Sequence, residues 1–161
     1  DFMFLKEFEI RWHDLDANRH LANISFLSFA SDTRMKFLKN IGLSHSTLMK
    51  LSIGPVVFNE HLFYFKEILP DEKINVSFEL AALSKDGTFF EFEHNYYNDK
   101  GENLARCEMS GGWINLKSRK LTSLPKDILK KFQISNKTSS FKEITSKDTR
   151  RWNREPKNLD K

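Results

Sequence analysis

Cysteine is almost absent from this chain of 161 residues, in which Cys107 is the only one. A single cysteine cannot form a disulfide within the chain, which fits a reducing compartment and predicts a cytoplasmic location. No apolar run comes near the roughly 20 residues that a membrane-spanning helix needs. The first residues show no basic stretch followed by an apolar one, so a secretory signal is not indicated.

Net charge is also lacking over most of the sequence. The whole excess of +4 lies between residues 134 and 161, and residues 1–133 carry equal numbers of basic and acidic side chains. A balanced body does not favour nucleic-acid binding. We therefore predict one domain over residues 1–133 and a polar, basic C-terminal tail over residues 134–161. The segment Lys137–Lys161 has few apolar residues, which leaves open a peripheral tail or a docked extension.

Apolar spacing predicts where the helices lie. Residues 23–41 form a wide apolar arc at helical spacing, which predicts a long helix that is mostly enclosed. Gly42 follows it, where a left-handed residue is expected. Shorter helices are predicted over Ser44–Lys50 and over Pro125–Phe132, the second with proline at its start.

Alternating patterns predict the strands. Phe4–Trp12 and Pro55–Leu69 read as strands, as do the runs around residues 74–80, 90–96 and 105–113. Turn signals at residues 85–87 and 98–101 join the later runs as hairpins, and Gly111-Gly112 suggests a bulge. No helix separates these strands, which disfavours a parallel α/β fold. The order predicts an α+β fold, with a curved antiparallel sheet wrapped around one long central helix.

The most polar stretch, residues 11–23, lies between the first strand and the long helix. It combines two carboxylates, two imidazoles and two carboxamides, at Asp14, Asp16, His13, His20, Asn18 and Asn23. The start of a helix offers free N–H groups and the positive end of its dipole to any oxygen placed there. The stretch is therefore the first candidate for chemistry.

This stretch resembles a motif of the 4-hydroxybenzoyl-CoA thioesterase-like branch of the hotdog-fold superfamily. The family pattern is Asp-x-Asp-x-x-Gly-His-Val-Asn-Asn, and here Asp14, Asp16, His20 and Asn23 occupy its polar positions. The resemblance implies a hotdog dimer, often paired into a tetramer, that hydrolyses acyl-CoA. It also implies that Asp16 is the nucleophile or general base, and that the thioester carbonyl is held by N–H groups near Asn23.

Two positions depart from the family pattern. Arg19 replaces the glycine and Ala22 replaces the first asparagine. Glycine permits close approach of a ligand or an unusual φ angle, whereas an arginine could crowd the pocket or reach a CoA phosphate. These departures bear on the substrate more than on the fold.

Each candidate also has a purely structural interpretation. We predict catalytic roles for Asp16, His20 and Asn23, although they could instead be a turn carboxylate, a loop histidine and a helix N-cap. Asp14 is expected to bond loop N–H groups, with a carboxylate pair as the alternative. Substrate contacts are predicted for Arg19, Ile24, Phe26, Glu60 and His61. Further candidates for the CoA phosphates are Lys117, Arg119 and Lys120.

Other chemistries have less support. His13, Asp14, Asp16 and His20 could ligate a metal but lack a standard spacing, so we predict no metal and no cofactor. Cys107 lies in an apolar strand, and no Gly-x-Ser-x-Gly elbow supports a serine nucleophile. The predicted function is hydrolysis of an acyl-CoA or acyl-carrier-protein thioester. A hotdog hydratase, or a non-catalytic protein that binds an acyl thioester or a protein partner, remains an alternative.

Overall fold

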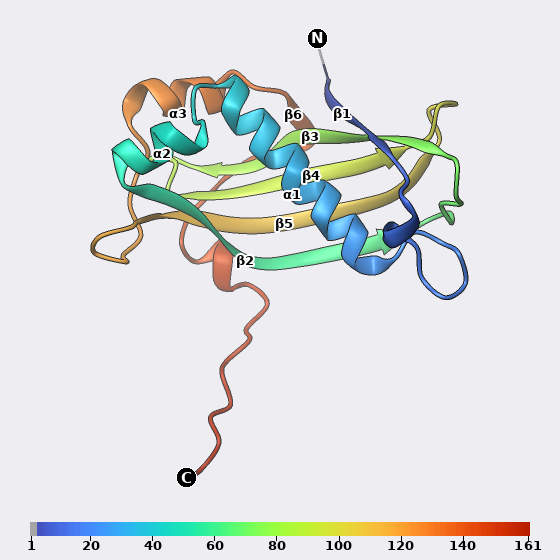
Figure 1. Ribbon diagram of the computed structural model, residues 1–161. Helices are drawn as coiled ribbons and strands as arrows, with labels where there is room; N and C mark the ends of the chain where they lie inside the picture. Colours follow the sequence, from blue (N-terminus) through green and yellow to red (C-terminus); the bar gives the residue numbers. More distant parts are fainter. Residues whose placement is uncertain (1–2) are drawn as a thin grey trace.

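The computed structural model describes residues 3–161, in which one long helix lies across a sheet of six strands (Figure 1). The strands are β1 (Phe4–Glu9), β2 (Ile53–Tyr64), β3 (Lys73–Ser84), β4 (Phe89–Tyr97), β5 (Asn103–Asn115) and β6 (Lys137–Ile144). The helices are α1 (Asn23–Asn40), α2 (His45–Leu51) and α3 (Lys126–Gln133), with 3₁₀ turns η1 (Trp12–Asp14) and η2 (Asp148–Arg150). None of the helices in this described range is long and apolar enough to cross a membrane.

The sheet has the order β1-β3-β4-β5-β2, and neighbours along this path are antiparallel. Strand β3 is longer than its partner β1, and β6 runs parallel to the other half of β3. Thus β1 and β6 share one edge of the sheet, and β2 forms the opposite edge. The predicted α+β fold is confirmed.

Helix α1 packs on the sheet through one face only. Its buried side chains are mainly aromatic or small, and they are Ser25, Phe26, Phe29, Ala30, Thr33, Phe37 and Leu38. The Phe37 ring stacks on Phe78 of β3 with centroids 3.8 Å apart. On the outer face Ile24 is 75% exposed and Met35 is also exposed. The prediction of a mostly enclosed helix is therefore wrong for the single chain, because only the sheet side is covered.

Strand β1 ends earlier than the sequence predicts. It stops at Glu9, and Trp12, the last residue of the predicted strand, lies outside it and is 80% exposed. The reason is local, since the Asp14 carboxylate accepts a hydrogen bond from the Arg11 N–H and draws the chain into a 3₁₀ turn. A side-chain acceptor here competes with the strand ladder for the backbone donor.

The two glycines of β5 allow a close approach of strands. A Cβ at Gly111 would lie 2.2 Å from the Val56 carbonyl oxygen, so no other residue fits. The register of β2 against β5 shifts between Val57 and Asn59, opposite this glycine. A bulge is present as predicted, with the extra residue, Phe58, on β2 rather than on β5. Gly42 has a φ of 89°, which confirms the predicted end of α1.

The C-terminal segment is attached to the body. Residues 137–144, expected as part of a tail, form β6, and Ile144 is buried. Beyond it, Arg151 forks onto the Glu91 carboxylate with distances of 2.7 and 3.0 Å. Of the two alternatives that the sequence left open, docking describes residues 137–152. The last residues extend away from the sheet (Figure 1).

Candidate functional site

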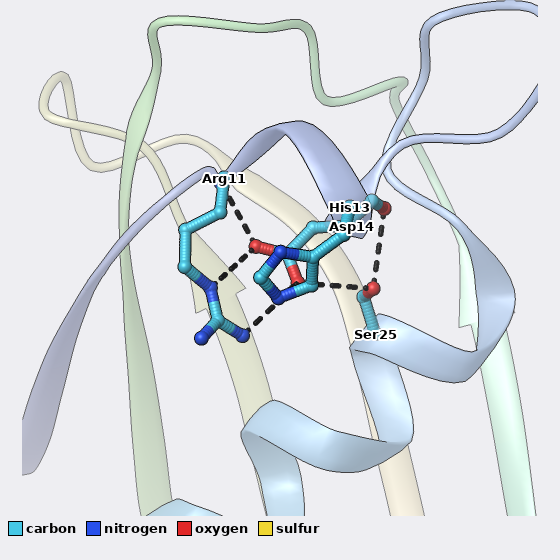
Figure 2. A network of polar contacts seen from close by, with 4 residues as sticks. All are labelled: Arg11, His13, Asp14 and Ser25. Carbon is cyan, nitrogen blue, oxygen red and sulfur yellow. Dashed lines mark hydrogen bonds and ion pairs between the residues drawn. The ribbon is translucent and has the colours of Figure 1, made fainter.

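Asp14 is locked into the fold at the start of the candidate loop (Figure 2). Its carboxylate accepts hydrogen bonds from the Arg11 backbone N–H at 2.8 Å and from the Arg11 side chain at 3.1 and 3.2 Å. The Ser25 hydroxyl of α1 donates to its carbonyl oxygen. Burial raises the Asp14 pKa, but the bonds and charge of Arg11 outweigh it and leave the pKa below its ordinary value. Asp14 therefore ties β1 to the start of α1.

Asp16 opens a tight turn and remains exposed. Its N–H donates to the His20 carbonyl oxygen, and an antiparallel bridge joins Leu15 to Leu21. The Oδ1 atom of Asp16 accepts from the N–H groups of Asn18 and His20 at 2.8 and 3.1 Å. No partner within residues 3–161 binds the second carboxylate oxygen. The turn holds the carboxylate in place and leaves Oδ2 open for reaction.

Arg19 has a left-handed backbone in this turn, with a φ of 62°. The family pattern has glycine at this position, and the geometry gives the reason, because a non-glycine residue is strained at such a φ. The Arg19 side chain is exposed and does not line the cavity described below.

The start of α1 supplies free donors. Ala22 is the N-cap and has no side-chain acceptor, so the alternative of Asn23 as the helix N-cap is wrong; Asn23 is the first helical residue. The Ser25 and Phe26 N–H groups bond the Ala22 carbonyl oxygen. Within the described residues, the Asn23 and Ile24 N–H groups have no acceptor. Two adjacent donors at a helix start suit an oxyanion.

Asp16, His20 and Asn23 meet at one cavity of about 330 Å³ beside this helix start. Its wall is completed by the end of β2 and the segment after it, and the remaining lining residues are Leu21, Phe26, Tyr64, Phe65, Lys66, Glu67 and Ile68. The rings of Phe26 and Tyr64 meet edge to face with centroids 5.1 Å apart. The cavity thus has a polar end at the turn and an aromatic side.

Glu67 is a site residue that the sequence analysis missed. Its Oε2 lies 2.9 Å from Nε2 of His20, and both side chains line the cavity. The sequence predicts strand through Leu69, whereas β2 ends at Tyr64 and the chain then curves toward the turn, where the Leu21 N–H bonds the Ile68 carbonyl oxygen. A signal was present, because Lys66-Glu67 interrupts an otherwise apolar run.

Within a single chain, several of the predicted substrate-binding residues lie far from this cavity in space. Ile24 points outward from α1, and Glu60 pairs with Arg34 at 3.4 Å farther along the helix. His61 lies on the opposite face of the sheet, where its ring lies against Trp152 with the two ring planes tilted by 36°. Only Phe26 of the predicted substrate residues lines the cavity.

The basic candidates for CoA phosphates are distant too. Lys117, Arg119 and Lys120 follow the end of β5, which pairs with the start of β2, whereas the cavity lies at the end of β2. Within one chain these three side chains therefore cannot contact the end of a ligand that Asp16 contacts.

A second buried polar group lies between α1 and the sheet. Nδ1 of His94 is 2.8 Å from the Ser77 carbonyl oxygen, and Nε2 is 3.2 Å from the Arg34 guanidinium. Burial and then the charge of Arg34 lower the His94 pKa to about 3, so the imidazole is neutral. Burial likewise raises the Cys107 pKa to about 12, which makes it a poor nucleophile. Residues 3–161 bring no three His, Cys, Asp or Glu side chains together to hold a metal.

Comparisons with known proteins agree with the fold. The model of the thioesterase-like superfamily matches residues 10–132. A curated protein of Aquifex aeolicus (strain VF5) is 23% identical over 126 residues, 78% of this chain and 94% of that protein. A hypothetical protein from Staphylococcus aureus, solved with CoA, superposes with a TM-score of 0.76 at 17% identity over 85% of this chain and 87% of that one. A 1,4-dihydroxy-2-naphthoyl-CoA thioesterase from Synechocystis gives 0.72 at 16% identity over 83% and 97%.

Proposed function

The chain belongs to the thioesterase-like superfamily with its hotdog fold, and from this premise we propose that it hydrolyses an acyl-CoA or acyl-carrier-protein thioester. One observation carries the proposal. Asp16, with one free carboxylate oxygen, faces the same cavity as the start of α1, where two N–H groups are unpaired. An attacking or activating carboxylate and an oxyanion site are the two parts that thioester hydrolysis needs.

The first step is addition to the thioester carbonyl. Asp16 Oδ2 either attacks the carbonyl carbon itself or takes a proton from a water molecule whose oxygen attacks. The carbonyl oxygen gains the negative charge and accepts hydrogen bonds from the Asn23 and Ile24 N–H groups. The positive end of the α1 dipole stabilises the same charge.

The second step breaks the carbon–sulfur bond, and the thiolate takes a proton. Glu67 holds Nε2 of His20 at 2.9 Å, which leaves Nδ1 free to exchange a proton with the water or the leaving thiol. If Asp16 is the nucleophile, water then cleaves the acyl-aspartyl anhydride and restores the carboxylate. The pair His20–Glu67 positions the proton transfer in either route.

We infer the substrate class from the aromatic side of the cavity and from two of the structural neighbours. The neighbour from Synechocystis acts on an aromatic acyl-CoA and the S. aureus neighbour binds CoA. Phe26 and Tyr64 would pack against an acyl group here, and Arg19 at the turn would reach toward a phosphate. Assignment to the 4-hydroxybenzoyl-CoA thioesterase-like branch remains a prediction.

The test is a panel of aromatic and aliphatic acyl-CoAs, with free thiol measured after reaction. Thiol release that needs the folded protein supports the proposal. Acyl-CoA binding without thiol release would contradict it and favour the non-catalytic alternative.

We also propose a homodimer or homotetramer. In it, a predicted substrate-binding residue that lies far from Asp16 of its own chain, such as Glu60, would face the cavity of a partner chain. The outer face of α1 is exposed in the single chain, which supports assembly. Sedimentation at micromolar concentration tests this, and a stable monomer would contradict it.

A further inference from the structure

The cavity beside Asp16 is closed on its inner side by Phe26, in the first turn of α1. Phe26 lines the cavity but is only 3% exposed, so its ring separates the cavity from the space under the helix. Ala30, one turn farther along α1, and Leu62 and Cys107 of the sheet do not line the cavity. Phe26 thus marks the boundary between the open cavity and the closed interior.

The sheet beneath Phe26 forms a seat for its ring. Tyr64, Ala105 and Tyr96 stand side by side on the neighbouring strands β2, β5 and β4. The Phe26 ring meets both tyrosine rings edge to face, with centroids 5.1 Å apart in each pair. Because the small Ala105 separates the two tyrosines, a ring that touches both of them fills the space over the alanine.

Tyr96 holds Phe26 in this position. It is fully buried, its hydroxyl donates to the Phe26 carbonyl oxygen, and its ring packs on the Phe26 side chain. Burial raises the Tyr96 pKa above its ordinary value, so the hydroxyl keeps the proton that it donates. One residue therefore fixes both the backbone and the ring of Phe26, which makes the ring a fixed wall of the cavity.

The space behind Phe26 is bordered by small side chains. Ala30, Ala105 and Cys107 are fully buried and belong to the same apolar cluster as Phe26. Leu62, directly opposite Cys107, packs against this cluster. A protein interior is close-packed, so an apolar chain enters this region only where the Phe26 ring is removed. Small neighbours leave the room of that ring to the chain that replaces it.

We propose that Phe26 limits the length of the acyl group, so that the substrates are short-chain or single-ring acyl thioesters. The inference rests on the proposed function, which places the thioester carbonyl at the N–H groups of Asn23 and Ile24. Phe26 follows them within one helical turn, so an acyl chain that runs along α1 from the carbonyl meets the ring after about 5 Å. A long chain has to turn back toward solvent, whereas a flat ring packs against Phe26 and Tyr64.

Ketone analogues of acyl-CoA, in which a methylene group separates the sulfur from the carbonyl, test the proposal because they cannot be hydrolysed. Titration calorimetry of the full chain gives Kd for the butanoyl and the octanoyl analogue. The wild type is expected to bind the octanoyl analogue no more tightly than the butanoyl one. In Phe26→Ala the octanoyl analogue should gain at least about tenfold over the butanoyl one, which burial of two methylene groups supplies.

Phe29→Ala is the matched control. Phe29 lies on the same buried face of α1, but its ring stacks on Phe8 of β1 and does not line the cavity. This variant should keep the wild-type ratio of the two Kd values. Phe26→Leu retains more of the apolar volume and replaces the alanine variant if melting shows that the latter is unfolded. It should shift the ratio in the same direction by about fourfold, the gain from one methylene group.

An unchanged ratio in the folded Phe26 variants would overturn the proposal, as would an equal shift in Phe29→Ala. Tighter octanoyl binding already in the wild type, or binding of neither analogue, would overturn it too. Failure of the proposed function looks different. If no acyl-CoA releases thiol but Phe26→Ala shows the expected shift, hydrolysis is contradicted and the limit on acyl length stands.

Discussion

Asp14 and Asp16 are two residues apart in one loop, yet their surroundings are opposite. Asp14 is 3% exposed and both its carboxylate oxygens are bonded by Arg11. Asp16 is exposed and uses one oxygen for the N–H groups of its own turn. A carboxylate whose acceptors are all occupied stabilises structure, whereas one held by a single oxygen keeps the other for a reactant. The comparison separates a fold-building residue from the one that we propose to be reactive.

The buried polar groups should make stability sensitive to acid. His94 is neutral in the native protein down to a pKa of about 3, against 6.5 when unfolded. Between these values the unfolded state binds the additional proton, so stability falls as pH decreases, by about 1.4 kcal/mol per pH unit at most. Chemical unfolding measured from pH 7 to 4 checks this. His94→Gln should flatten the slope, and an equal slope in both proteins would refute the role of His94.

Glu67→Gln should reduce turnover about tenfold, less than the roughly 100-fold or more that loss of an acid–base group itself costs. The physical reason is that His20 loses the charge that fixes Nε2. His20→Gln should lose at least as much, and the double variant should lose little more, since the two act as a unit. Thiol-release kinetics measure kcat for each. Glu102→Gln breaks the nearby pair with Lys66 and should change kcat less than twofold; an equal loss there would remove the special role of Glu67.

Asp14→Asn should lower stability by about 1–2 kcal/mol, because Arg11 loses a charged acceptor at a buried position. The amide oxygen still accepts from the Arg11 N–H, so the turn persists and kcat should stay within a few-fold. Denaturant unfolding and thiol release on the same sample give both numbers. A large loss of kcat in a fully folded variant would indicate that Asp14 and Asp16 work as a carboxylate pair. The separate roles assigned to the two residues would then be wrong.

Arg19→Gly should have the smallest effect on stability. Relief of the left-handed strain, about 1 kcal/mol, is offset by the entropy that glycine loses on folding, about 0.5–1 kcal/mol. If the guanidinium contacts a CoA phosphate, an exposed pair worth at most about 1 kcal/mol, KM should rise by up to about fivefold. An unchanged KM would show that Arg19 only fills the turn.

The fold was predictable because it rests on periodic patterns. The strands predicted around residues 90–96 and 105–113 are β4 and β5, and their alternating residues Phe90, Phe92 and Trp113 are buried. The competition between a side chain and the strand ladder for one backbone N–H group was not predictable in the same way. Trp12 fits the strand pattern of β1, yet the Asp14 side chain takes the Arg11 N–H and ends the strand.

The site was predictable where it is contiguous in sequence. Asp16, His20 and Asn23 lie within eight positions and meet at one cavity. Glu67 joins them only because β2 ends at Tyr64 and the chain turns back, which no spacing rule reveals. Glu60 and His61 are neighbours along β2, so the two point to opposite faces of the sheet, and strand alternation argues against placing both in one pocket.

The most direct test of the account compares Asp16→Asn with the wild type in acyl-CoA binding and in kcat. Asparagine keeps the Oδ1 acceptor for the turn but removes the negative charge from Oδ2. Binding and melting temperature should therefore remain close to those of the wild type, while kcat falls by at least about 100-fold. An Asp16→Asn protein that hydrolyses a good substrate at the wild-type rate would contradict the assignment of Asp16 as the reactive carboxylate.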